Sequence, residues 1–301
     1  MEPIAIIGGG IIGLSSAYYL NKAGFKVTIL DKGDLTDGCS FGNAGMIVPS
    51  HIIPLAAPGM ITKGCRWMFD STSPFYIKLR FSKDLVKWGY QFYKHSNKKN
   101  VERAIPALKE IGLFSKAMYQ QLVKELPFDF GYQERGLLIL YQGGETEKEE
   151  IETAHHANQA GLEAHVLSLP ELQKLEPDIR IRARGGVYYP GDAHLAPRLL
   201  VEKLILYMKQ AGVTFHTNTT VTGFHIENNF VKAVKTDQGD FGIDKLVMAS
   251  GSWSGELVST LGISLPMQAG KGYSFSLPNV EKNTRIPTIF LEARVAVTPM
   301  G

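Results

Sequence analysis

Cysteine is scarce in this chain of 301 residues, which contains only Cys39 and Cys65. The two lie far apart in the sequence and form no CxxC pair, so neither a structural zinc site nor a disulfide scaffold is expected. His155 and His156 are adjacent in a predicted helix and point about 100° apart, which does not suit joint ligation of a metal. We therefore expect no metal site, and we expect a reducing, cytoplasmic location.

Long hydrophobic runs are also missing. No stretch reaches the roughly 18 uninterrupted apolar residues that a transmembrane helix requires. Residues 3–20 are apolar enough to be mistaken for a signal sequence, but Glu2 is acidic and three consecutive glycines interrupt the run. We interpret this segment as a strand followed by a helix.

Neither sign of charge dominates. The net charge is +3 and the calculated pI is about 8.6, and no clustered basic patch is present, so a nucleic-acid partner is not expected. Repeats, low-complexity tracts and flexible linkers are absent as well. With 44% hydrophobic and 20% charged residues, the composition is that of a globular protein long enough for two domains.

The first thirty or so residues show the pattern of a βαβ unit. Residues 4–7 form a β-branched apolar run, residues 11–23 follow helical spacing up to Gly24, and residues 26–30 supply a second strand. A right-handed crossover would place both strands in one parallel sheet.

Three glycines between the first strand and the helix, Gly8, Gly10 and Gly13, match the spacing G-x-G-x-x-G. The first permits a tight turn, the second lets a pyrophosphate approach the backbone, and the third lets the helix pack on the strand. Asp31 ends the second strand, where a carboxylate accepts hydrogen bonds from a ribose diol. This pattern predicts dinucleotide binding and disfavours a 2′-phosphate, but by itself it does not separate NAD from FAD.

Further elements follow along the chain. Helices are expected at residues 83–95, 101–125, 145–159 and 194–210, with a short capped helix opening at Ser168. Residues 128–141 look like a strand, and residues 213–251 look like a run of strands that returns the chain to the first sheet, with turns at Asn228-Asn229 and Gln238-Gly239.

The segment after the βαβ unit gives a more specific signal. In "GCSFGNAGMIVPSHIIPLAAPGM", Ser40, Asn43, Ala44 and Gly45 offer small residues and hydrogen-bonding groups where a long cofactor would run. Other distinctive segments are "IIGGGIIGLSSAYYL", "RWMFDSTSPFYIKLRFSKDLVKWGYQF", "DKLVMASGSWS" and "GKGYSF". These segments span essentially the whole chain. In them the sequence resembles the FAD-dependent D-amino-acid oxidase and glycine oxidase superfamily, and within it the D-amino-acid dehydrogenase small-subunit-like enzymes.

The resemblance implies an α/β fold in which a Rossmann-like FAD-binding domain is interleaved with an α+β substrate domain carrying an antiparallel sheet. We expect residues 1–80 and 145–258 in the FAD-binding domain, and residues 81–144 and 259–301 in the substrate domain. Members of this family continue beyond "VAVTPMG". We therefore expect this chain to be truncated at its C-terminus, without the arginine that usually pairs with the substrate carboxylate.

The resemblance also implies contacts with FAD. The glycine turn and Asp31 would hold the pyrophosphate and the adenosine ribose, residues 40–46 would run beside the pyrophosphate, ribityl chain and flavin, and Val221 would contact the adenine. A second small-residue turn at residues 249–253 would line the cofactor, unless it is only a strand-to-helix turn. The full set is Gly8, Gly10, Ile12, Gly13, Asp31, Lys32, Ser40, Asn43, Ala44, Gly45, Met46, Val221, Ala249, Gly251 and Trp253.

Three side chains are candidates for contact with the substrate: His51, Tyr273 and Arg294. The Tyr273 hydroxyl and the Arg294 guanidinium can bind a carboxylate, and His51 lies in the loop after the cofactor segment. Each residue also has a reading without a substrate role. His51 could be a hydrogen-bonded loop histidine, Tyr273 could pack in a strand, and Arg294 could be a surface arginine.

The function implied by the resemblance is oxidative deamination of a D-amino acid, or of a related amine such as D-hydroxyproline or glycine. Hydride passes from Cα to FAD, and the electrons pass to a quinone or another carrier. An oxygen-reducing oxidase and a truncated, non-catalytic flavin-binding protein remain alternatives, and residues 40–45 disfavour a nicotinamide enzyme. The aromatic and basic segment 67–92 admits either internal packing or peripheral contact with the cytoplasmic face of a membrane.

Overall fold

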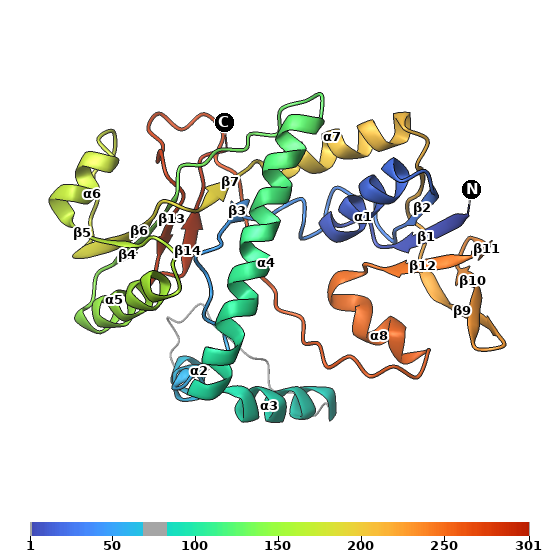
Figure 1. Cartoon of the computed structure of the whole chain (residues 1–301), viewed down its shortest axis with the longest axis horizontal. Helices are drawn as coiled ribbons and strands as arrows, with labels where there is room; N and C mark the ends of the chain where they lie inside the picture. The colour runs from blue at the N-terminus through green and yellow to red at the C-terminus, as the bar shows by residue number, and fades with distance from the viewer. Residues whose placement is uncertain (1, 69–82, 301) are drawn as a thin grey trace. The chain divides into compact units, whose positions relative to one another are not determined.

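The structure is a computed structural model that describes residues 2–68 and 83–300, with residues 65–68 as backbone only (Figure 1). The backbone forms two compact units. The first unit comprises Met1–Asn43 and Pro197–Phe275, and the second unit comprises Ala44–Ala196 and Ser276–Gly301. Each unit is thus built from two separate stretches of the chain, as an interleaved fold requires.

A parallel sheet forms the centre of the first unit. Its strand order is β12 (Lys245–Met248), β1 (Pro3–Ile7), β2 (Lys26–Leu30) and β8 (Thr214–His216), and all neighbours are parallel. Helix α1 (Ile11–Lys22) packs on β1, β2 and α7 (Pro197–Gln210). Since a parallel sheet is covered on both faces, its central strand is apolar throughout: every residue from Ile4 to Ile7 is buried.

A three-stranded antiparallel sheet completes the regular β-structure described in the first unit. It contains β9 (Val221–Glu227), β10 (Phe230–Thr236) and β11 (Gly239–Gly242). Asn228 and Asn229 join β9 to β10 with φ of 51° and 65°, the left-handed pair that a two-residue hairpin turn of type I′ needs. The turn predicted at these asparagines is confirmed.

The chain leaves β12 through a 3-10 turn (Gly251–Trp253) and helix α8 (Ser254–Ser259). Residues 263–275 then have no regular secondary structure. The strand considered as the alternative setting for Tyr273 is therefore wrong.

The second unit contains a five-stranded mixed sheet. Its order is β14 (Val295–Val297), β13 (Thr288–Phe290), β4 (Leu137–Tyr141), β6 (Gly185–Tyr189) and β5 (His165–Ser168). Only β13 and β4 run parallel, and the other neighbours are antiparallel. A separate two-stranded ribbon pairs β3 (Met46–Ile47) with β7 (Ala193–His194). Together with the parallel sheet of the first unit, these sheets confirm the predicted fold class.

The helices described in the second unit are α2 (Met60–Met68), α3 (Lys83–His95), α4 (Lys98–Glu125), α5 (Gly144–Gln159) and α6 (Leu169–Leu175). Strand β4 is buried at every position because both faces of its sheet are covered. On one face Leu137, Ile139 and Tyr141 share a core with Ala154 and Ala157 of α5, and on the other Leu138 and Leu140 meet Leu172 of α6.

The division into units differs from the predicted domain boundaries. Residues 145–196 belong to the second unit because β5 and β6 join the sheet of β4. Residues 44–68 belong there as well, since β3 pairs with β7. Residues 259–275 fall in the first unit. In the segment 67–92, residues 69–82 and the side chain of Trp67 lie outside the described residues.

Three predicted elements begin at other residues than expected. The helix predicted at 194–210 begins at Pro197, because residues 193–194 are taken up by β7. The helix predicted at 101–125 begins at Lys98, where the Asn97 side chain accepts a hydrogen bond from the Asn100 N–H at 2.9 Å. In residues 128–141, only Leu137–Tyr141 forms a strand.

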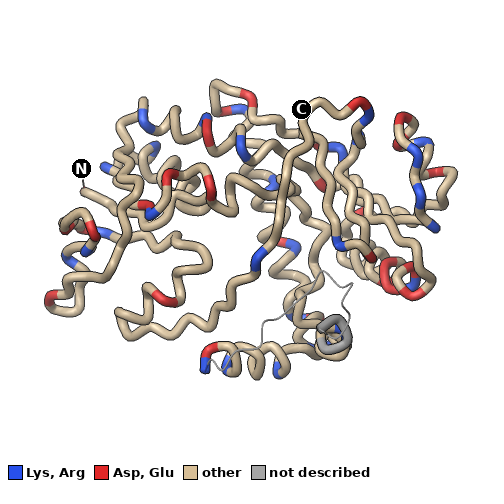
Figure 2. The backbone as a smooth tube through the Cα atoms, turned by 180° about the vertical axis from the view of Figure 1, so that it is seen from behind, with Lys and Arg blue, Asp and Glu red and all other residues tan. Residues whose placement is uncertain are grey.

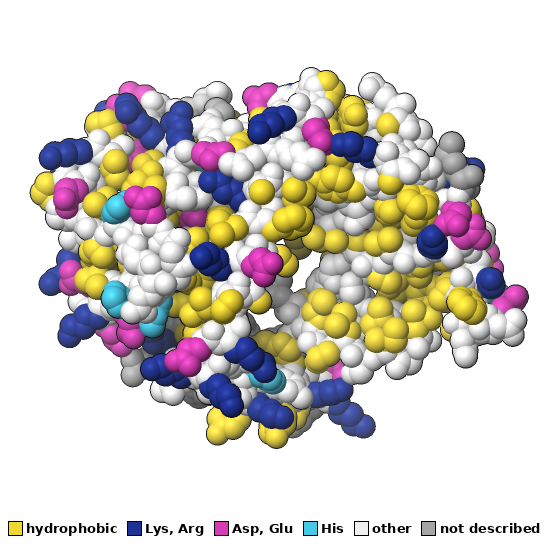
Figure 3. Space-filling model, in the orientation of Figure 1, with side chains coloured by type: hydrophobic (Ala, Val, Ile, Leu, Met, Phe, Trp, Pro, Cys, Tyr) yellow, Lys and Arg dark blue, Asp and Glu magenta, His cyan; other side chains and the backbone are white. Residues whose placement is uncertain are grey.

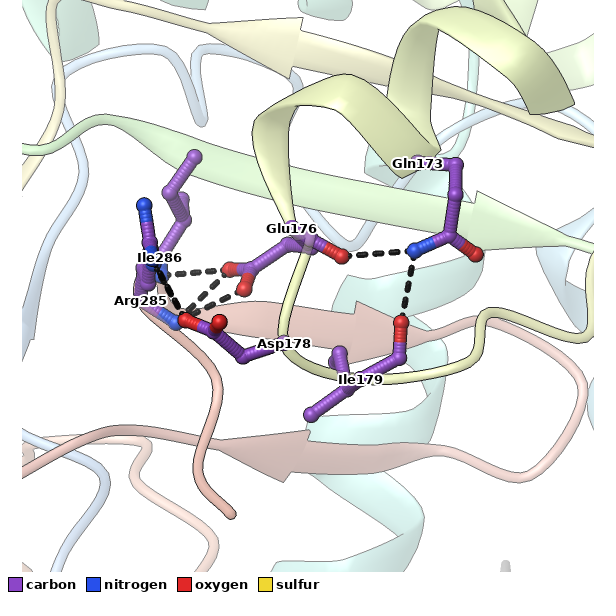
Figure 4. A network of polar contacts seen from close by, with 6 residues as sticks. All are labelled: Gln173, Glu176, Asp178, Ile179, Arg285 and Ile286. Carbon is purple, nitrogen blue, oxygen red and sulfur yellow. Dashed lines mark hydrogen bonds and ion pairs between the residues drawn. The ribbon is translucent and has the colours of Figure 1, made fainter.

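A buried carboxylate holds the returning segment of the second unit (Figure 4). Glu176, which is 1% exposed, accepts hydrogen bonds from the backbone N–H groups of Arg285 and Ile286 at 2.7–2.9 Å. Gln173 braces the same turn by donating to the carbonyl oxygens of Glu176 and Ile179. The clamp fixes the chain immediately before β13.

In the part of the chain that the structure describes, no helix is long and apolar enough to cross a membrane. No group of three or more His, Cys, Asp or Glu side chains among these residues is placed to hold a metal ion.

Candidate cofactor site

The glycine turn between β1 and α1 is tightly packed. Gly8 has φ of 102°, and a methyl group added there would lie 2.4 Å from the carbonyl oxygen of Ala249. A methyl group at Gly13 would lie 1.8 Å from the carbonyl oxygen of Gly8. Both positions therefore require glycine, one for the turn and one for the approach of helix to strand.

The turns after β1 and β12 lie side by side. Ala249 donates its N–H to the carbonyl oxygen of Ile7 at 2.8 Å, which extends the pairing of the two strands to their carboxyl ends. The two predicted small-residue turns therefore lie at the same edge of the sheet. Ligands of open parallel sheets bind at this edge, beyond the carboxyl ends of the strands.

Asp31 is fixed by the backbone of the glycine turn. Its Oδ2 accepts a hydrogen bond from the Gly9 N–H at 2.6 Å, and its Oδ1 accepts one from the Gly33 N–H at 2.8 Å. The side chain is only partly buried, and each carboxylate oxygen has a second lone pair. Asp31 is thus held where it can accept hydrogen bonds from a ribose diol.

Ser40 lies at the N-terminus of α1. Its Oγ accepts a hydrogen bond from the Ile11 N–H at 2.8 Å, and a methyl group at Gly10 would lie 3.2 Å from this Oγ. Gly10 caps the helix without a side chain, and the first turn of α1 holds no acidic residue. The N-terminus of α1 therefore keeps its partial positive charge for an anion, and the Ser40 hydroxyl proton can be donated to a phosphate oxygen.

Asn43 and the neighbouring backbone fold the segment that carries Ser40. The Asn43 Nδ2 donates to the carbonyl oxygens of Cys39 and Ser40 at 3.0 and 3.1 Å. Ser274 Oγ donates to the carbonyl oxygen of Gly42 at 3.0 Å. Within this part of the first unit, Asn43 acts on the backbone of its own segment.

Lys32 and Trp253 meet after β2 and β12. The Lys32 Nζ lies 3.4 Å from the centroid of the Trp253 ring, a close cation–π contact, and Trp253 remains 51% exposed. Ile12, in the first turn of α1, is 67% exposed, and Val221 begins β9. An exposed aromatic ring at the sheet edge suits stacking with a planar heterocycle.

These features fit an FAD adenylate and pyrophosphate: two glycines that admit no side chain, a helix whose first turn holds no acidic residue, and an oriented carboxylate. The residues that would hold this part of FAD all belong to the first unit. The remaining predicted contacts, Ala44, Gly45 and Met46, belong to the second unit.

Residues 44–46 are held by hydrogen bonds within the second unit. The Gly45 carbonyl oxygen accepts from the Leu195 N–H at 2.9 Å, the Ala44 carbonyl oxygen accepts from Thr298 Oγ1 at 2.6 Å, and Met46 pairs with His194 across the ribbon. The short segment is thus tied to two distant parts of the sequence.

The three substrate candidates are dispersed among loops. Tyr273 is 87% exposed in the irregular segment of the first unit. His51 is exposed after β3, and Arg294 is exposed in the turn between β13 and β14 with φ of 51°. His51 and Arg294 belong to the second unit and Tyr273 to the first.

Two buried polar residues of the second unit were missed by the sequence analysis. Asp192 accepts hydrogen bonds from the N–H and Oγ of Ser50 at 3.1 and 2.5 Å, and burial raises the pKa of Asp192 to about 6. It thereby anchors the loop that carries His51. His194 is fully buried, and burial together with the charge of Arg135 lowers its pKa. Both residues lie in the segment "YYPGDAHLAP". Its residue spacing matches no motif, so the sequence offered no signal that would have identified them.

A parallel sheet with a glycine turn, a helix without an acidic residue in its first turn and an acid directly after the second strand is typical of a dinucleotide-binding fold. The sequence profile of the FAD dependent oxidoreductase family, DAO, matches residues 3–301. The chain belongs to this family, so the predictions of an FAD-dependent oxidoreductase and of FAD as its cofactor are confirmed.

Curated relatives narrow the resemblance. The chain is 30% identical over 300 residues to a D-amino acid dehydrogenase of Helicobacter pylori strain J99, covering 99% of this chain and 72% of the relative. It is 31% identical over 302 residues to a D-amino acid dehydrogenase of Vibrio vulnificus, covering 97% and 72%. The predicted resemblance to the D-amino-acid dehydrogenases is confirmed.

Solved structures share the fold. Glycine oxidase from Geobacillus kaustophilus superimposes with a TM-score of 0.61 at 21% identity, over 88% of this chain and 60% of that protein. L-amino acid deaminase from Proteus myxofaciens gives a TM-score of 0.60 at 18% identity, over 88% and 49%. An FAD-bound L-α-glycerophosphate oxidase from Mycoplasma pneumoniae gives 0.56 at 20% identity, over 86% and 57%.

Proposed function

We propose that the chain carries out FAD-dependent oxidative deamination of a D-amino acid or of a related amine such as D-hydroxyproline or glycine. The similarity to D-amino acid dehydrogenases along 99% of the chain is the observation that carries this proposal. The geometry of the glycine turn, Asp31 and Ser40 supports it, because these residues fit the cofactor that such a reaction needs.

When bound, FAD supplies the acceptor for the two electrons and the hydrogen removed from the substrate. The Cα–H bond breaks, the amine nitrogen gives up a proton, and an imine results. The imine of a primary amino acid takes up water to yield a 2-oxo acid and ammonia, whereas the cyclic imine of D-hydroxyproline takes up water by opening its ring and releases no ammonia. A quinone or another carrier then accepts the two electrons. Because neutral amine can be taken from solution, no side chain need act as a base.

The chain's own residues would position the reactants. We propose that Gly8, Gly10, Ile12 and Gly13 admit and bind the pyrophosphate, with Ser40 donating a hydrogen bond to it. Asp31 and Lys32 would orient the adenosine, with Val221 and the turn at 249–253 beside it, and residues 43–46 would lie along the ribityl chain and flavin. The substrate contacts proposed are His51, Tyr273 and Arg294.

An assay with paired enantiomers tests the proposal. The purified chain loaded with FAD is incubated with D- and L-forms of alanine and proline, and with glycine, in the presence of a water-soluble quinone. We expect 2-oxo acid from a D-substrate, with one equivalent of quinone reduced per molecule. Turnover of L-forms only, or of none, would contradict it. Hydrogen peroxide without quinone reduction would favour the oxidase alternative.

The proposal places the protein in the cytoplasm, in keeping with its two cysteines. Since quinones dissolve in the lipid phase, it also includes peripheral contact with the cytoplasmic face of a membrane. Fractionation of cells that express the chain, with and without a salt wash, tests this location.

A further inference from the structure

His194 has a buried side chain whose polar atoms are not paired. All eight histidines of the chain lie in the described residues, and His194 alone among them is buried, at 0% exposure. The histidine side chains visible in cyan in Figure 3 lie at the surface. Neither Nδ1 nor Nε2 of His194 has a hydrogen-bond partner among the described residues. An unpaired buried polar group costs roughly 1–3 kcal/mol, so its presence in the second unit calls for a physical reason.

The backbone of His194 holds the segment 44–46 in place. Its N–H and its carbonyl oxygen both bond to Gln133, at 2.9 and 2.8 Å, and the residue pairs with Met46 across the ribbon of β3 and β7. The N–H of the next residue donates to the Gly45 carbonyl oxygen at 2.9 Å. The imidazole is therefore buried at the ribbon that fixes residues 44–46.

The surroundings of the ring favour the neutral imidazole. The ribbon strands β3 and β7 contain no charged residue, so they are tan in Figure 2. Burial and the positive charge of Arg135 lower the pKa of His194, and the Pro299 carbonyl oxygen acts in the opposite sense without forming a hydrogen bond to either ring nitrogen. The carboxylate of Asp192, two residues earlier, is bonded to Ser50. A protonated ring would thus be a second positive charge beside Arg135, buried without a carboxylate partner among the described residues.

We propose that His194 is a positioning residue: its neutral imidazole keeps the ribbon closed around residues 44–46, and protonation of the ring opens the ribbon. The inference rests on the proposed place of these residues along the ribityl chain and flavin. A histidine whose pKa is lowered by burial binds fewer protons in the closed ribbon than in the open one. The closed ribbon therefore loses stability as the pH falls below 6.5, the ordinary value for histidine. Burial raises the pKa of Asp192, so the titration of Asp192 acts in the opposite direction.

Hydrogen exchange of the ribbon tests the proposal on the full 301-residue chain without cofactor. Exchange of the backbone amides in β3 and β7 is followed by mass spectrometry at about pH 7.5 and about pH 5.5, after division by the intrinsic effect of pH. We expect the protection of the ribbon to fall by about fivefold or more at the lower pH, whereas the protection of β4 should not fall. No loss in the ribbon, or an equal loss in β4, would overturn the proposal.

Matched variants assign the opening to His194. The substitutions His194→Phe and His194→Leu place an uncharged apolar side chain where the ring nitrogens have no partner, so the fold should tolerate at least one of them. We expect the tolerated variant to keep its ribbon protection at the lower pH. His165→Gln removes an exposed histidine of the same unit and should open as the parent does. Opening of the His194 variants to the extent of the parent would overturn the assignment.

Release of FAD is measured in parallel, by the rise in flavin fluorescence after dilution. We expect release to be about fivefold or more faster at about pH 5.5 than at about pH 7.5 in the parent and in His165→Gln, and to change less in His194→Phe. A chain that binds no FAD at either pH would contradict the proposed function and with it the positioning role. Bound FAD that the parent and His194→Phe release equally would overturn the positioning role alone.

Discussion

Asp31 joins the two parts of the cofactor turn through both of its carboxylate oxygens. One accepts from Gly9 in the turn after β1, and the other accepts from Gly33 beyond β2. A single side chain thus shapes the turn, and we propose that the same side chain binds the ribose. We therefore expect removal of the Asp31 carboxylate to weaken FAD binding in two ways: it changes the geometry of the turn, and it removes contacts to the cofactor.

At this scale the first prediction concerns Asp31→Asn. An amide has one acceptor oxygen in place of two, so one of the two backbone N–H groups loses its partner, at a cost of roughly 1–3 kcal/mol. We expect FAD to bind at least about tenfold more weakly, measured by quenching of flavin fluorescence. Asp34→Asn is the control, because Asp34 is exposed and accepts hydrogen bonds from the nearby Thr36. Equal losses in both variants would rule out a specific role for Asp31.

The second prediction concerns Gly13→Ala. The added methyl group would meet the Gly8 carbonyl oxygen at 1.8 Å, so helix and strand must separate. We expect a loss of about 2 kcal/mol or more in unfolding free energy and weaker FAD binding, measured by urea unfolding and by flavin titration. Gly144→Ala adds the same methyl group where no atom lies within 4 Å. Tight FAD binding by Gly13→Ala would contradict the role of this close approach.

The sequence predicted the packing of the glycine turn because a tight turn demands glycine at fixed offsets: Gly8 and Gly13 have no room for a side chain. Ribose binding by Asp31 stays a prediction. Asp192 and His194 were missed because their roles come from burial between strands distant in sequence, which no local pattern reveals.

Among the elements, α6 and the turn after it hold the segment that enters β13. The capping box of α6, with Ser168 and Glu171, was identifiable from the sequence. The carboxylate of Glu176 just after the helix was not, since its partners lie more than a hundred residues away.

A third prediction follows for Glu176→Ala. The backbone N–H groups of Arg285 and Ile286 would be left unpaired, and we expect a loss of roughly 3 kcal/mol in unfolding free energy. Urea unfolding followed by circular dichroism measures it. Glu163→Ala is the control, because Glu163 pairs with His165 on the surface, where such pairs contribute little. A loss no greater than that of the control would show that the clamp does not stabilise the segment.

Helix existence was easier to predict than helix ends. The periodic segments 83–95 and 145–159 became α3 and α5 with at most one residue of difference. The predicted start of α7 was wrong because residues 193–194 form β7 and pair with β3. This pairing depends on tertiary contacts. Propensity does not register such a competition.

At the scale of the whole molecule, the division of the chain into two units could not be predicted from local sequence patterns. The sheet of the second unit joins β4, β6 and β5 with β13, which lies nearly 150 residues after β4. The sequence predicted that two domains interleave, but which segments join which sheet depends on non-local pairing.

A fourth prediction concerns the pH dependence of global stability. Burial raises the pKa of Glu150 to about 7, although the Tyr189 hydroxyl donates to it at 2.8 Å. A carboxyl group with a raised folded-state pKa binds more protons in the folded state, so stability falls as pH rises from about 4.5 through about 7. With Asp192 adding to the same trend, we expect a loss of a few kcal/mol over this window, measured by urea unfolding at several pH values.

The matched variant for this prediction is Glu150→Gln. It keeps an acceptor for Tyr189 and removes the buried charge, so the loss of stability between pH 5 and about pH 8 should be clearly smaller than in the parent. Glu145→Gln changes an exposed residue of the same helix and should leave the slope intact. A slope unchanged by Glu150→Gln would contradict the assignment of the titration to this group.

The most direct test of the central claim is the visible absorption spectrum of the purified chain with FAD, before and after anaerobic addition of D-amino acids. The account predicts protein-bound flavin bands that bleach with a D-amino acid or glycine and persist with the L-form. Bound flavin that no amine of the panel bleaches, or a chain that does not retain FAD, would contradict it.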